Sequence, residues 1–300
     1  MAKIVVTTPT GNIGHVVTDR LLDAGAEVTV IARNPSKLKE SVRQRARVVT
    51  GDQFDPAVTR EASKGADALF WLTPPTFDTP DWRAYFERSA EVATEAVRTN
   101  GIPYVVHLSS GGADRPTGYG PVSFLHPVER SLAATGANVL QLRPGYFYEN
   151  FLASLPTIRD MGTIYGVPKP ETVYPMIATR DIGEAAARQL LALDWKGERI
   201  LGLHGPADTP SFGEAARILG EAIGKPVQYV QVPTSALQDQ LRGMGASESV
   251  AVSYGELFEA LDRGEQPAEP RTPETTTPTR LYDWAREVLA PLIQTPLSGS

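Results

Sequence analysis

The chain has 300 residues, a length that can bury a sizeable core and is typical of one large α/β domain or two smaller units. It contains no cysteine, which excludes disulfides, thiolate metal sites and a cysteine nucleophile. With 29 basic against 35 acidic residues the net charge is −6, so no overall positive field attracts nucleic acid or an anionic membrane.

No apolar run approaches the roughly 18 residues of a membrane span. Met1 is followed at once by a strand-like segment, which leaves no room for a signal peptide. No H-E-x-x-H motif or acidic cluster indicates a metal site. We therefore expect a cytoplasmic globular protein without a metal, monomeric or homodimeric, that binds neither a membrane nor nucleic acid directly.

Short apolar runs alternate with amphipathic stretches through the first 145 residues. The runs are rich in Val, Ile and Leu with little polar alternation, as in strands covered on both faces, and they occupy residues 3–8, 27–32, 47–50, 68–73, 104–109 and 138–142. Asn34-Pro35 and Asp55-Pro56 each place a capping side chain before a proline at the first helical position. This alternation predicts right-handed crossovers and an α/β fold with a doubly wound parallel sheet, the Rossmann arrangement.

The order of elements changes after Pro144-Gly145. Residues 146–180 are loop-rich without a clean period. Residues 266–280 are rich in proline and threonine, which predicts an extended surface loop, and Thr277-Pro278 is expected to cap a last helix. Between them the pattern predicts helices at 181–193, 211–223, 234–242 and 247–263, with strands at 199–203 and 227–232. We expect a nucleotide-binding domain of residues 1–145 and 178–205, and a smaller substrate-covering domain of residues 146–177 and 206–300.

A glycine-containing turn separates the first predicted strand from the first helix. In such a turn, backbone N–H groups and the helix N-terminus face a pyrophosphate. Gly11 would allow close approach of the backbone, Gly14 would allow close packing of the helix on the strand, and Thr8, in place of a first glycine, is expected to hold an extended φ below zero. The alternative is an ordinary strand–helix turn. The residues predicted to bind the phosphates are Thr8, Thr10, Gly11, Asn12, Ile13 and Gly14.

Basic residues follow the second predicted strand, where an NAD site would place an acid. Arg33 and Lys37 match an adenosine 2′-phosphate in charge, and the guanidinium also matches it in geometry, so the pair favours NADP over NAD. The alternative is a solvated basic residue opening a surface helix. Asp52-Gln53 after the third strand could meet the adenine edge or could simply form the turn before Asp55.

Several motifs along the chain together resemble the NmrA-like branch of the atypical short-chain dehydrogenases/reductases, including its NADPH-dependent quinone and triarylmethane reductases. They are 10–14 (TGNIG), 31–38 (IARNPSKL), 107–110 (HLSS), 142–150 (LRPGYFYEN), 224–227 (GKPV) and 260–265 (ALDRGE). The resemblance implies NADPH over the carboxyl ends of the strands and a smaller domain closing over a flat, aromatic or quinone-like substrate. Further cofactor contacts are then expected at Leu72, Thr73, Pro74, Ser109, Pro144, Gly145, Tyr146 and Phe147.

The Tyr-x-x-x-Lys pair of most short-chain dehydrogenases is missing. If Glu129 takes the lysine position, the tyrosine position is Leu125, so the usual proton donor is absent. The remaining candidates for chemistry are Ser109, His126 and Tyr146. His126 could supply a proton, or it could be a helix-entry residue bonded to the backbone.

Aromatic residues near the predicted strand ends and in the irregular segment indicate a flat, apolar ligand. The candidates are Phe77, Trp82, Phe124, Tyr148, Phe151 and Tyr165. We therefore expect an NADPH-dependent oxidoreductase acting on a small aromatic or quinone-like acceptor. The alternative is a non-catalytic NADP(H)-sensing regulator, because nucleotide binding would survive loss of the Tyr-Lys pair. A hydrolase on the same sheet lacks the G-x-S-x-G motif.

Overall fold

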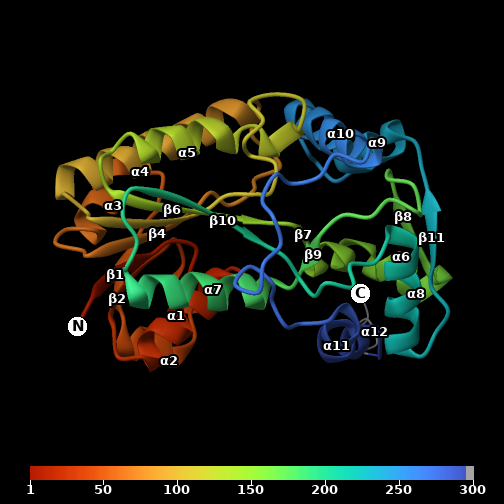
Figure 1. The fold of residues 1–300 in the computed structure, drawn as a ribbon, viewed down its shortest axis with the longest axis horizontal. Coiled ribbons are helices and arrows are strands. Elements are labelled where there is room, and N and C mark those ends of the chain that lie inside the picture. The colour runs from red at the N-terminus through yellow and green to blue at the C-terminus, as the bar shows by residue number, and fades with distance from the viewer. Residues whose placement is uncertain (295–300) are drawn as a thin grey trace.

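The computed structural model describes residues 1–294 and is built around a seven-stranded parallel sheet (Figure 1). The strand order is β10-β6-β5-β4-β1-β2-β3. The strands are β1 (Lys3–Val6), β2 (Glu27–Ala32), β3 (Arg47–Thr50), β4 (Ala68–Leu72), β5 (Tyr104–Leu108), β6 (Asn138–Pro144) and β10 (Glu198–Leu203). The order reverses between β1 and β4, which is where open α/β sheets bind nucleotides. The predicted doubly wound sheet is confirmed.

Helices cover both faces of this sheet (Figure 1). On one face lie α1 (Gly14–Asp23), α2 (Glu40–Arg45) and α7 (Thr179–Ala192), and on the other lie α3 (Pro56–Ala62), α4 (Trp82–Asn100) and α5 (Leu125–Ala133). Neighbouring strand residues alternate between the two cores: Val105 belongs to one cluster and Val106 to the other. Both predicted caps that precede a proline are confirmed. The Asn34 side chain accepts a hydrogen bond from the Ser36 amide, and the Asp55 side chain accepts one from the Ala57 amide.

The remaining elements form a smaller layer beyond the carboxyl ends of the strands. Two short parallel sheets join β7 (Tyr146–Phe147) to β9 (Met176–Ile177), and β8 (Thr163–Gly166) to β11 (Gln228–Gln231). The helices there are α6 (Leu155–Met161), α8 (Phe212–Ile223), α9 (Thr234–Gly243), α10 (Glu248–Asp262), α11 (Leu281–Trp284) and α12 (Ala290–Gln294), with a 3-10 helix at Tyr148–Ser154 and a π-helical turn at Ala285–Leu289. Two further 3-10 helices lie in connections of the main sheet, Pro35–Lys37 between β2 and α2 and Gly120–Val122 between β5 and α5.

Two predictions in this half are wrong. Residues 146–180 are not loop-rich, because the 3-10 helix Tyr148–Ser154 runs into α6, and a 3-10 helix does not have the α-helical period by which helices are recognised. The last helix begins at Leu281 with Arg280 as its N-cap, so Thr277 does not cap it. Thr277 is buried instead and its amide donates to the carbonyl of His204.

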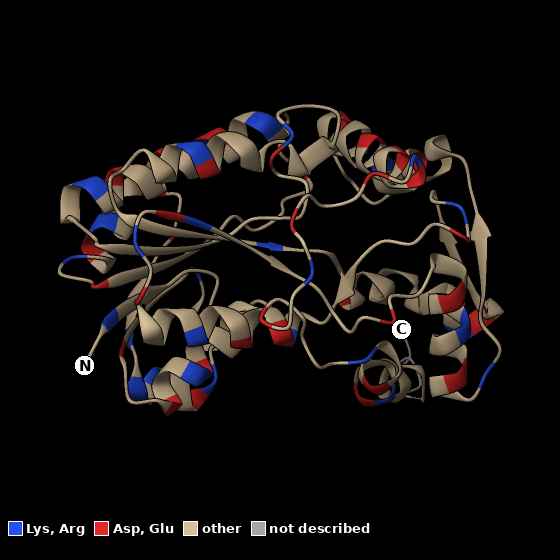
Figure 2. Cartoon of the chain, in the orientation of Figure 1, with Lys and Arg blue, Asp and Glu red and all other residues tan. Residues whose placement is uncertain are grey.

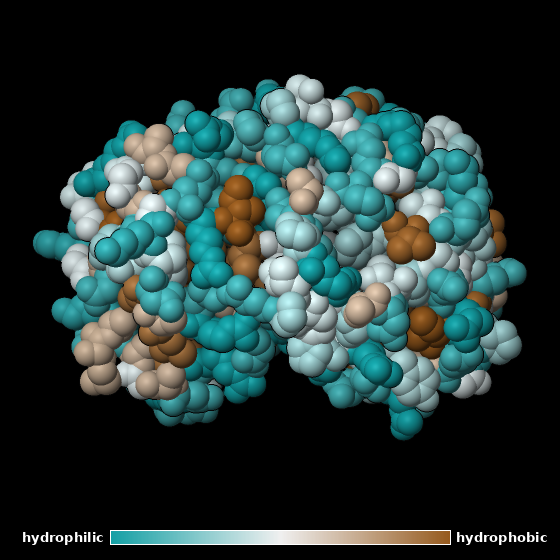
Figure 3. All heavy atoms as spheres, in the orientation of Figure 1, coloured by the Kyte–Doolittle hydropathy of each residue, from teal (hydrophilic) through white to brown (hydrophobic). Residues whose placement is uncertain are grey.

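Charges of both signs are interspersed over the outward faces of the helices (Figure 2). Ion pairs such as Arg20–Glu184 and Arg60–Glu95 are solvent exposed. Hydrophobic residues on the face in Figure 3 form small separate patches. Within residues 1–294, no helix is long and apolar enough to cross a membrane.

The chain between α10 and α11, residues 263–280, crosses the molecule in an extended conformation (Figure 1). We call it the crossing segment. It continues the edge of the sheet, because the amide of His204 donates to Thr275 at 2.9 Å and Thr277 donates back to His204 at 2.8 Å. Thr275, Thr277 and Thr279 are buried while the residues between them are more exposed. The extended conformation is confirmed, but the segment is not a simple surface loop.

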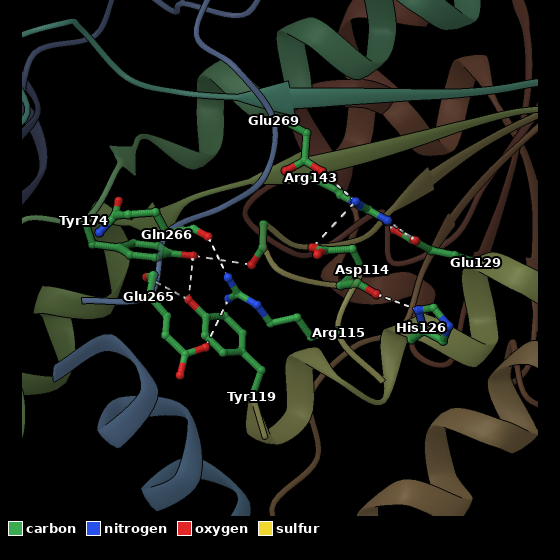
Figure 4. Close-up of polar contacts among 12 residues, drawn as sticks. Asp114, Arg115, Tyr119, His126, Glu129, Arg143, Tyr174, Glu265, Gln266 and Glu269 are labelled. Carbon is green, nitrogen blue, oxygen red and sulfur yellow. Dashed lines mark hydrogen bonds and ion pairs between the residues drawn. The ribbon is translucent and has the colours of Figure 1, made fainter. Parts of the chain in front are cut away.

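A buried arginine joins the crossing segment and α5 to the sheet (Figure 4). Arg143, at the carboxyl end of β6, donates to both carboxylate oxygens of Glu129 and, through its third nitrogen, to Glu269. The side chains are 6%, 4% and 11% exposed. Burial opposes the charge, but the hydrogen bonds and negative charges of the two glutamates raise the pKa of Arg143 above its ordinary value. The arginine therefore remains charged and holds three segments together.

The turn between β1 and α1 contains an unusual backbone conformation. Thr8 has a φ of +52°, and its hydroxyl is buried without a hydrogen-bond partner in the described chain. The expected extended φ below zero is therefore wrong. Its carbonyl faces Gly14, where a Cβ would lie only 2.1 Å from the Thr8 oxygen. The turn brings the first strand and the helix so close together that the backbone at position 8 is forced into the left-handed region.

We predict that Thr8→Gly stabilises the protein. A β-branched residue at this φ is strained by roughly 1 kcal/mol, and the substitution also removes an unsatisfied buried hydroxyl. Urea denaturation should show a free energy of unfolding higher by about 1 kcal/mol. The control Thr10→Gly, in an exposed position of the same turn that lacks a positive φ, should be neutral or destabilising. A Thr8→Gly variant no more stable than the control would contradict the strain.

We further predict that Glu129→Gln destabilises the fold by about 3 kcal/mol, because it removes one carboxylate from a buried guanidinium. The matched control is Glu95→Gln, which breaks the exposed pair with Arg60 and should cost no more than about 0.5 kcal/mol. Urea denaturation of both variants at one pH and salt concentration measures the difference. Equal losses would show that the Arg143 cluster contributes no more than a surface ion pair.

Candidate functional site

The carboxyl ends of β1, β2, β4, β5 and β6 meet at one edge of the sheet, and the predicted cofactor residues lie along it. At β1, Thr10, Gly11 and Asn12 are exposed, and no side chain caps the N-terminus of α1. The Gly11 amide donates to the Thr8 carbonyl at 3.0 Å, but the uncapped start of α1 leaves backbone N–H groups that are open to an anion. A Cβ on Gly11 would meet nothing closer than the Thr8 oxygen at 3.5 Å, so the fold itself does not require glycine there.

The next strand end carries two cations without partners. Arg33 and Lys37 are exposed, and neither side chain makes a hydrogen bond or ion pair with any residue from 1 to 294. Nearby, the Tyr85 hydroxyl donates to the Pro74 carbonyl at 3.0 Å. Burial, followed by the nearby charge of Asp52, raises the pKa of Tyr85 to about 12, with Arg33 acting in the opposite direction. Arg33, Asp52 and Tyr85 thus lie close enough to form one end of a nucleotide site.

Asp52 and Gln53 have structural roles in this region. The Asp52 carboxylate accepts from the Phe54 amide at 2.9 Å, which supports the turn before Asp55. The Gln53 side chain donates to the Leu72 carbonyl at 2.8 Å and is buried. These contacts fit the turn interpretation of the pair. A contact with adenine stays a prediction for both residues.

The middle of the edge is formed by the ends of β4, β5 and β6. Thr73 is tied to Ser89 of α4 at 2.6 Å, which fixes the chain around Leu72 and Pro74. The amide of Ser109 donates to Leu142 at 2.8 Å, and that of Gly145 to Leu203 at 3.2 Å. The Ser109 hydroxyl, however, is buried and has no hydrogen-bond partner within the described chain. An unsatisfied hydroxyl at a strand end suits a polar ligand that would complete its hydrogen bonding.

The candidates for proton transfer lie in different environments. Leu125 is 8% exposed and packs in the core, and Glu129 is paired with Arg143. The His126 ring bonds through Nδ1 to the Ala113 carbonyl at 3.0 Å (Figure 4), which matches the helix-entry interpretation. Burial, and then the neighbouring Tyr254, raise the pKa of Tyr146 well above its ordinary value. Tyr146 remains beside Pro144-Gly145, with Phe147 next to it in β7.

The predicted substrate aromatics do not form a single wall. Four of them are buried in one core cluster: Trp82, Phe124, Tyr148 and Phe151. The Tyr148 hydroxyl donates to the Thr279 carbonyl at 3.2 Å, so it holds the crossing segment. Tyr165 is 44% exposed on the separate β8–β11 sheet, and Phe77 is 45% exposed in the loop after β4. Of these residues, Phe77 is the one that combines exposure with a place in a loop following the main sheet.

Sequence analysis missed the tyrosine that α10 contributes here. Tyr254 stacks on Phe77, with ring centroids 6.0 Å apart and planes at 12°. Its ring is also 5.0 Å from that of Trp82 and 6.4 Å from that of Phe258. Tyr254 and Phe258 are four residues apart on one helix, a spacing that also describes an ordinary core-facing stripe. The four-residue spacing of these aromatics is visible in the sequence, but it does not distinguish residues of a binding site from residues of a hydrophobic core.

Within the described residues, no group of His, Asp or Glu side chains is placed to hold a metal ion. The polar groups at the edge of the sheet are instead an uncapped helix terminus, two unpaired cations and an unsatisfied serine hydroxyl. These groups fit a phosphorylated dinucleotide stretched across the strand ends.

Known proteins are similar to this chain in sequence or in fold. An NAD(P)H azoreductase of Xenophilus azovorans is 29% identical over 257 residues, which are 85% of this chain and 86% of that protein. Quinone oxidoreductase 2 of Escherichia coli is 28% identical over 269 residues, covering 85% of this chain and 90% of its own. The crystal structure of a triphenylmethane reductase from Citrobacter sp. matches with a TM-score of 0.78 at 19% identity, over 96% of this chain and 99% of the other, and shows the same fold. The NmrA-like family model matches residues 1–278, and the chain therefore belongs to the NmrA-like family.

Proposed function

We propose that the protein is an NADPH-dependent oxidoreductase that transfers hydride to a flat, aromatic or quinone-like acceptor without a Tyr-x-x-x-Lys pair. Relatives that span most of the chain include an azoreductase named for NAD(P)H and a quinone oxidoreductase. The observation that carries the choice of cofactor is the pair of unpartnered cations, Arg33 and Lys37, at the end of β2.

Different parts of the edge would hold different parts of NADPH. The exposed backbone at Thr10, Gly11 and Asn12 would bind the pyrophosphate, and Arg33 with Lys37 would bind the 2′-phosphate. Ser109 and the loop at Gly145 and Tyr146 would lie along the reactive end, where the cofactor supplies a hydride. The Ser109 hydroxyl there is buried and finds no hydrogen-bond partner among residues 1–294.

A second candidate function is an NADP(H)-sensing regulator without turnover. What favours it is that both positions of the usual catalytic pair are used by the fold: Leu125 is in the core and Glu129 is bonded to Arg143. The His126 ring is also engaged, by the Ala113 carbonyl. Nucleotide binding does not depend on these residues.

Loss of NADPH absorbance separates the two functions. The purified protein, mixed with NADPH and a panel of quinones, enones, azo dyes and triarylmethane dyes, should oxidise NADPH above the rate without protein for at least one flat acceptor. Tight NADPH binding without turnover on any member of the panel would instead support the sensor.

We predict that Arg33→Ala weakens NADPH binding by about 10- to 150-fold, the effect of losing a charge-assisted hydrogen bond of roughly 1.5–3 kcal/mol. NADH lacks the 2′-phosphate and should bind almost unchanged. Arg33→Asp should discriminate further against NADPH, because it repels the phosphate and offers an acceptor to the free ribose hydroxyls. Titrations with both nucleotides at one ionic strength measure these affinities.

The control is Arg188→Ala, an exposed arginine in the second half of α7. The helix returns from the carboxyl edge of the sheet, so this residue should not influence either nucleotide. If Arg33→Ala weakened NADPH and NADH equally, Arg33 would support the fold and would not recognise the phosphate.

A further inference from the structure

The hydroxyl of Tyr254 makes no hydrogen bond that would support the described fold. It makes no hydrogen bond with any residue in the described part of the chain, although the tyrosine is only partly exposed. The Tyr254 oxygen keeps some contact with solvent. The indole nitrogen of neighbouring Trp82, by contrast, is buried and has no hydrogen-bond partner among the described residues. A ligand could therefore reach the Tyr254 hydroxyl.

The ring of Tyr254 is fixed by aromatic neighbours on several sides. Phe77 lies nearly parallel to it at 6.0 Å, Phe258 at 6.4 Å, and Trp82 is tilted against it at 5.0 Å. Packed rings of this kind restrict a side chain to one rotamer. The direction of the hydroxyl is therefore set before any ligand binds.

Backbone contacts fix α10 in the same way. The Ser247 amide, at the N-terminus of α10, donates to the Phe77 carbonyl at 2.8 Å, and the Trp82 amide donates to the Ser249 hydroxyl at 3.0 Å. Gly120, in the segment after β5, packs so closely that a Cβ there would lie 2.0 Å from the Ser253 carbonyl. α10 is thus docked on the loops that follow β4 and β5.

The hydroxyl of Tyr254 also lies within electrostatic range of the loop that follows β6. Burial raises the pKa of Tyr146 first, and the Tyr254 phenol raises it further. Tyr146 follows Gly145 directly, at the end of β6. Because α10 is docked on the loops that follow β4 and β5, Tyr254 lies on the same side of the molecule as these strand ends, where we expect the reactive end of the cofactor.

We propose that the Tyr254 hydroxyl donates a hydrogen bond to the carbonyl oxygen of a quinone-like acceptor. This inference rests on the proposed reductase function. As the hydride from NADPH adds to the acceptor, an electron pair moves onto that oxygen, and the tyrosine O–H stabilises the resulting oxyanion. A proton from water then completes the reduction. The tyrosine keeps its own proton throughout.

The chemical environment suits a donor of this kind. Burial raises the pKa of Tyr254 to about 12, so the phenol stays protonated through the neutral range. Aromatic rings surround it, so the hydrogen bond would form where few water molecules compete. The acceptor class that uses both features is a flat ring carrying a carbonyl oxygen.

The test compares two acceptors in wild-type protein and Tyr254→Phe, which keeps the ring and removes the hydroxyl. With menadione, kcat/KM should fall by about 10- to 100-fold. With crystal violet, hydride adds to a cationic carbon and no oxygen takes up charge, so kcat/KM should stay within about two-fold. The affinity for NADPH should be the same in Tyr254→Phe as in wild-type protein. The control Tyr282→Phe, an exposed tyrosine on α11, should match wild type throughout.

An unchanged rate with menadione would overturn the proposal, and so would equal losses with menadione and crystal violet, which would make Tyr254 a packing residue. If wild-type protein oxidised NADPH with neither acceptor and with no other member of the panel, the proposed reductase function would fail. Menadione binding to the NADPH-loaded protein would then decide the inference on its own. Binding about five-fold weaker in Tyr254→Phe would support the hydrogen bond, and equal affinity would contradict it.

Discussion

The guanidinium of Arg143 is buried at the carboxyl end of β6, and a charge in that position is tolerated only with carboxylates beside it. Glu129 of α5 supplies one and Glu269 of the crossing segment supplies the other. The crossing segment then extends the sheet edge through His204 and leads into α11. A single buried cation thus ties the crossing segment, and with it part of the C-terminal layer, to the strand ends.

This ion pair also limits the chemistry available at α5. A lysine in place of Glu129 would put a second cation against Arg143 and leave the guanidinium with Glu269 and, at 3.9 Å, Asp114. The usual Tyr-Lys pair therefore cannot be restored by Leu125→Tyr with Glu129→Lys without several kcal/mol of destabilisation. A donor for the acceptor must then come from elsewhere. α10, which faces the same strand ends from the C-terminal layer, supplies one in Tyr254.

The strands of the main sheet could be predicted because apolar runs such as 27–32 are buried on both faces and show little polar alternation. The exposed position of Arg33 at the end of β2 could be predicted because its place relative to the turn is fixed by the βαβ unit, whereas its contact with a phosphate stays a prediction. The φ of Thr8 could not, since it results from close packing against Gly14. The bond between Arg143 and Glu269 joins residues 126 positions apart, which no local pattern reveals.

The two ends of the site are built in different ways, and this affects what substitutions can change. At the adenosine end, Arg33 and the turn at Gly11 are exposed and carry little of the fold, so cofactor preference can be altered without loss of stability. At the acceptor end, the rings of Trp82 and Phe124 belong to the core. Truncating either would open a cavity at a cost of about 3–5 kcal/mol. Acceptor preference is therefore more readily changed through Phe77, which is exposed, and through the hydroxyl of Tyr254, whose removal leaves the packing of its ring intact.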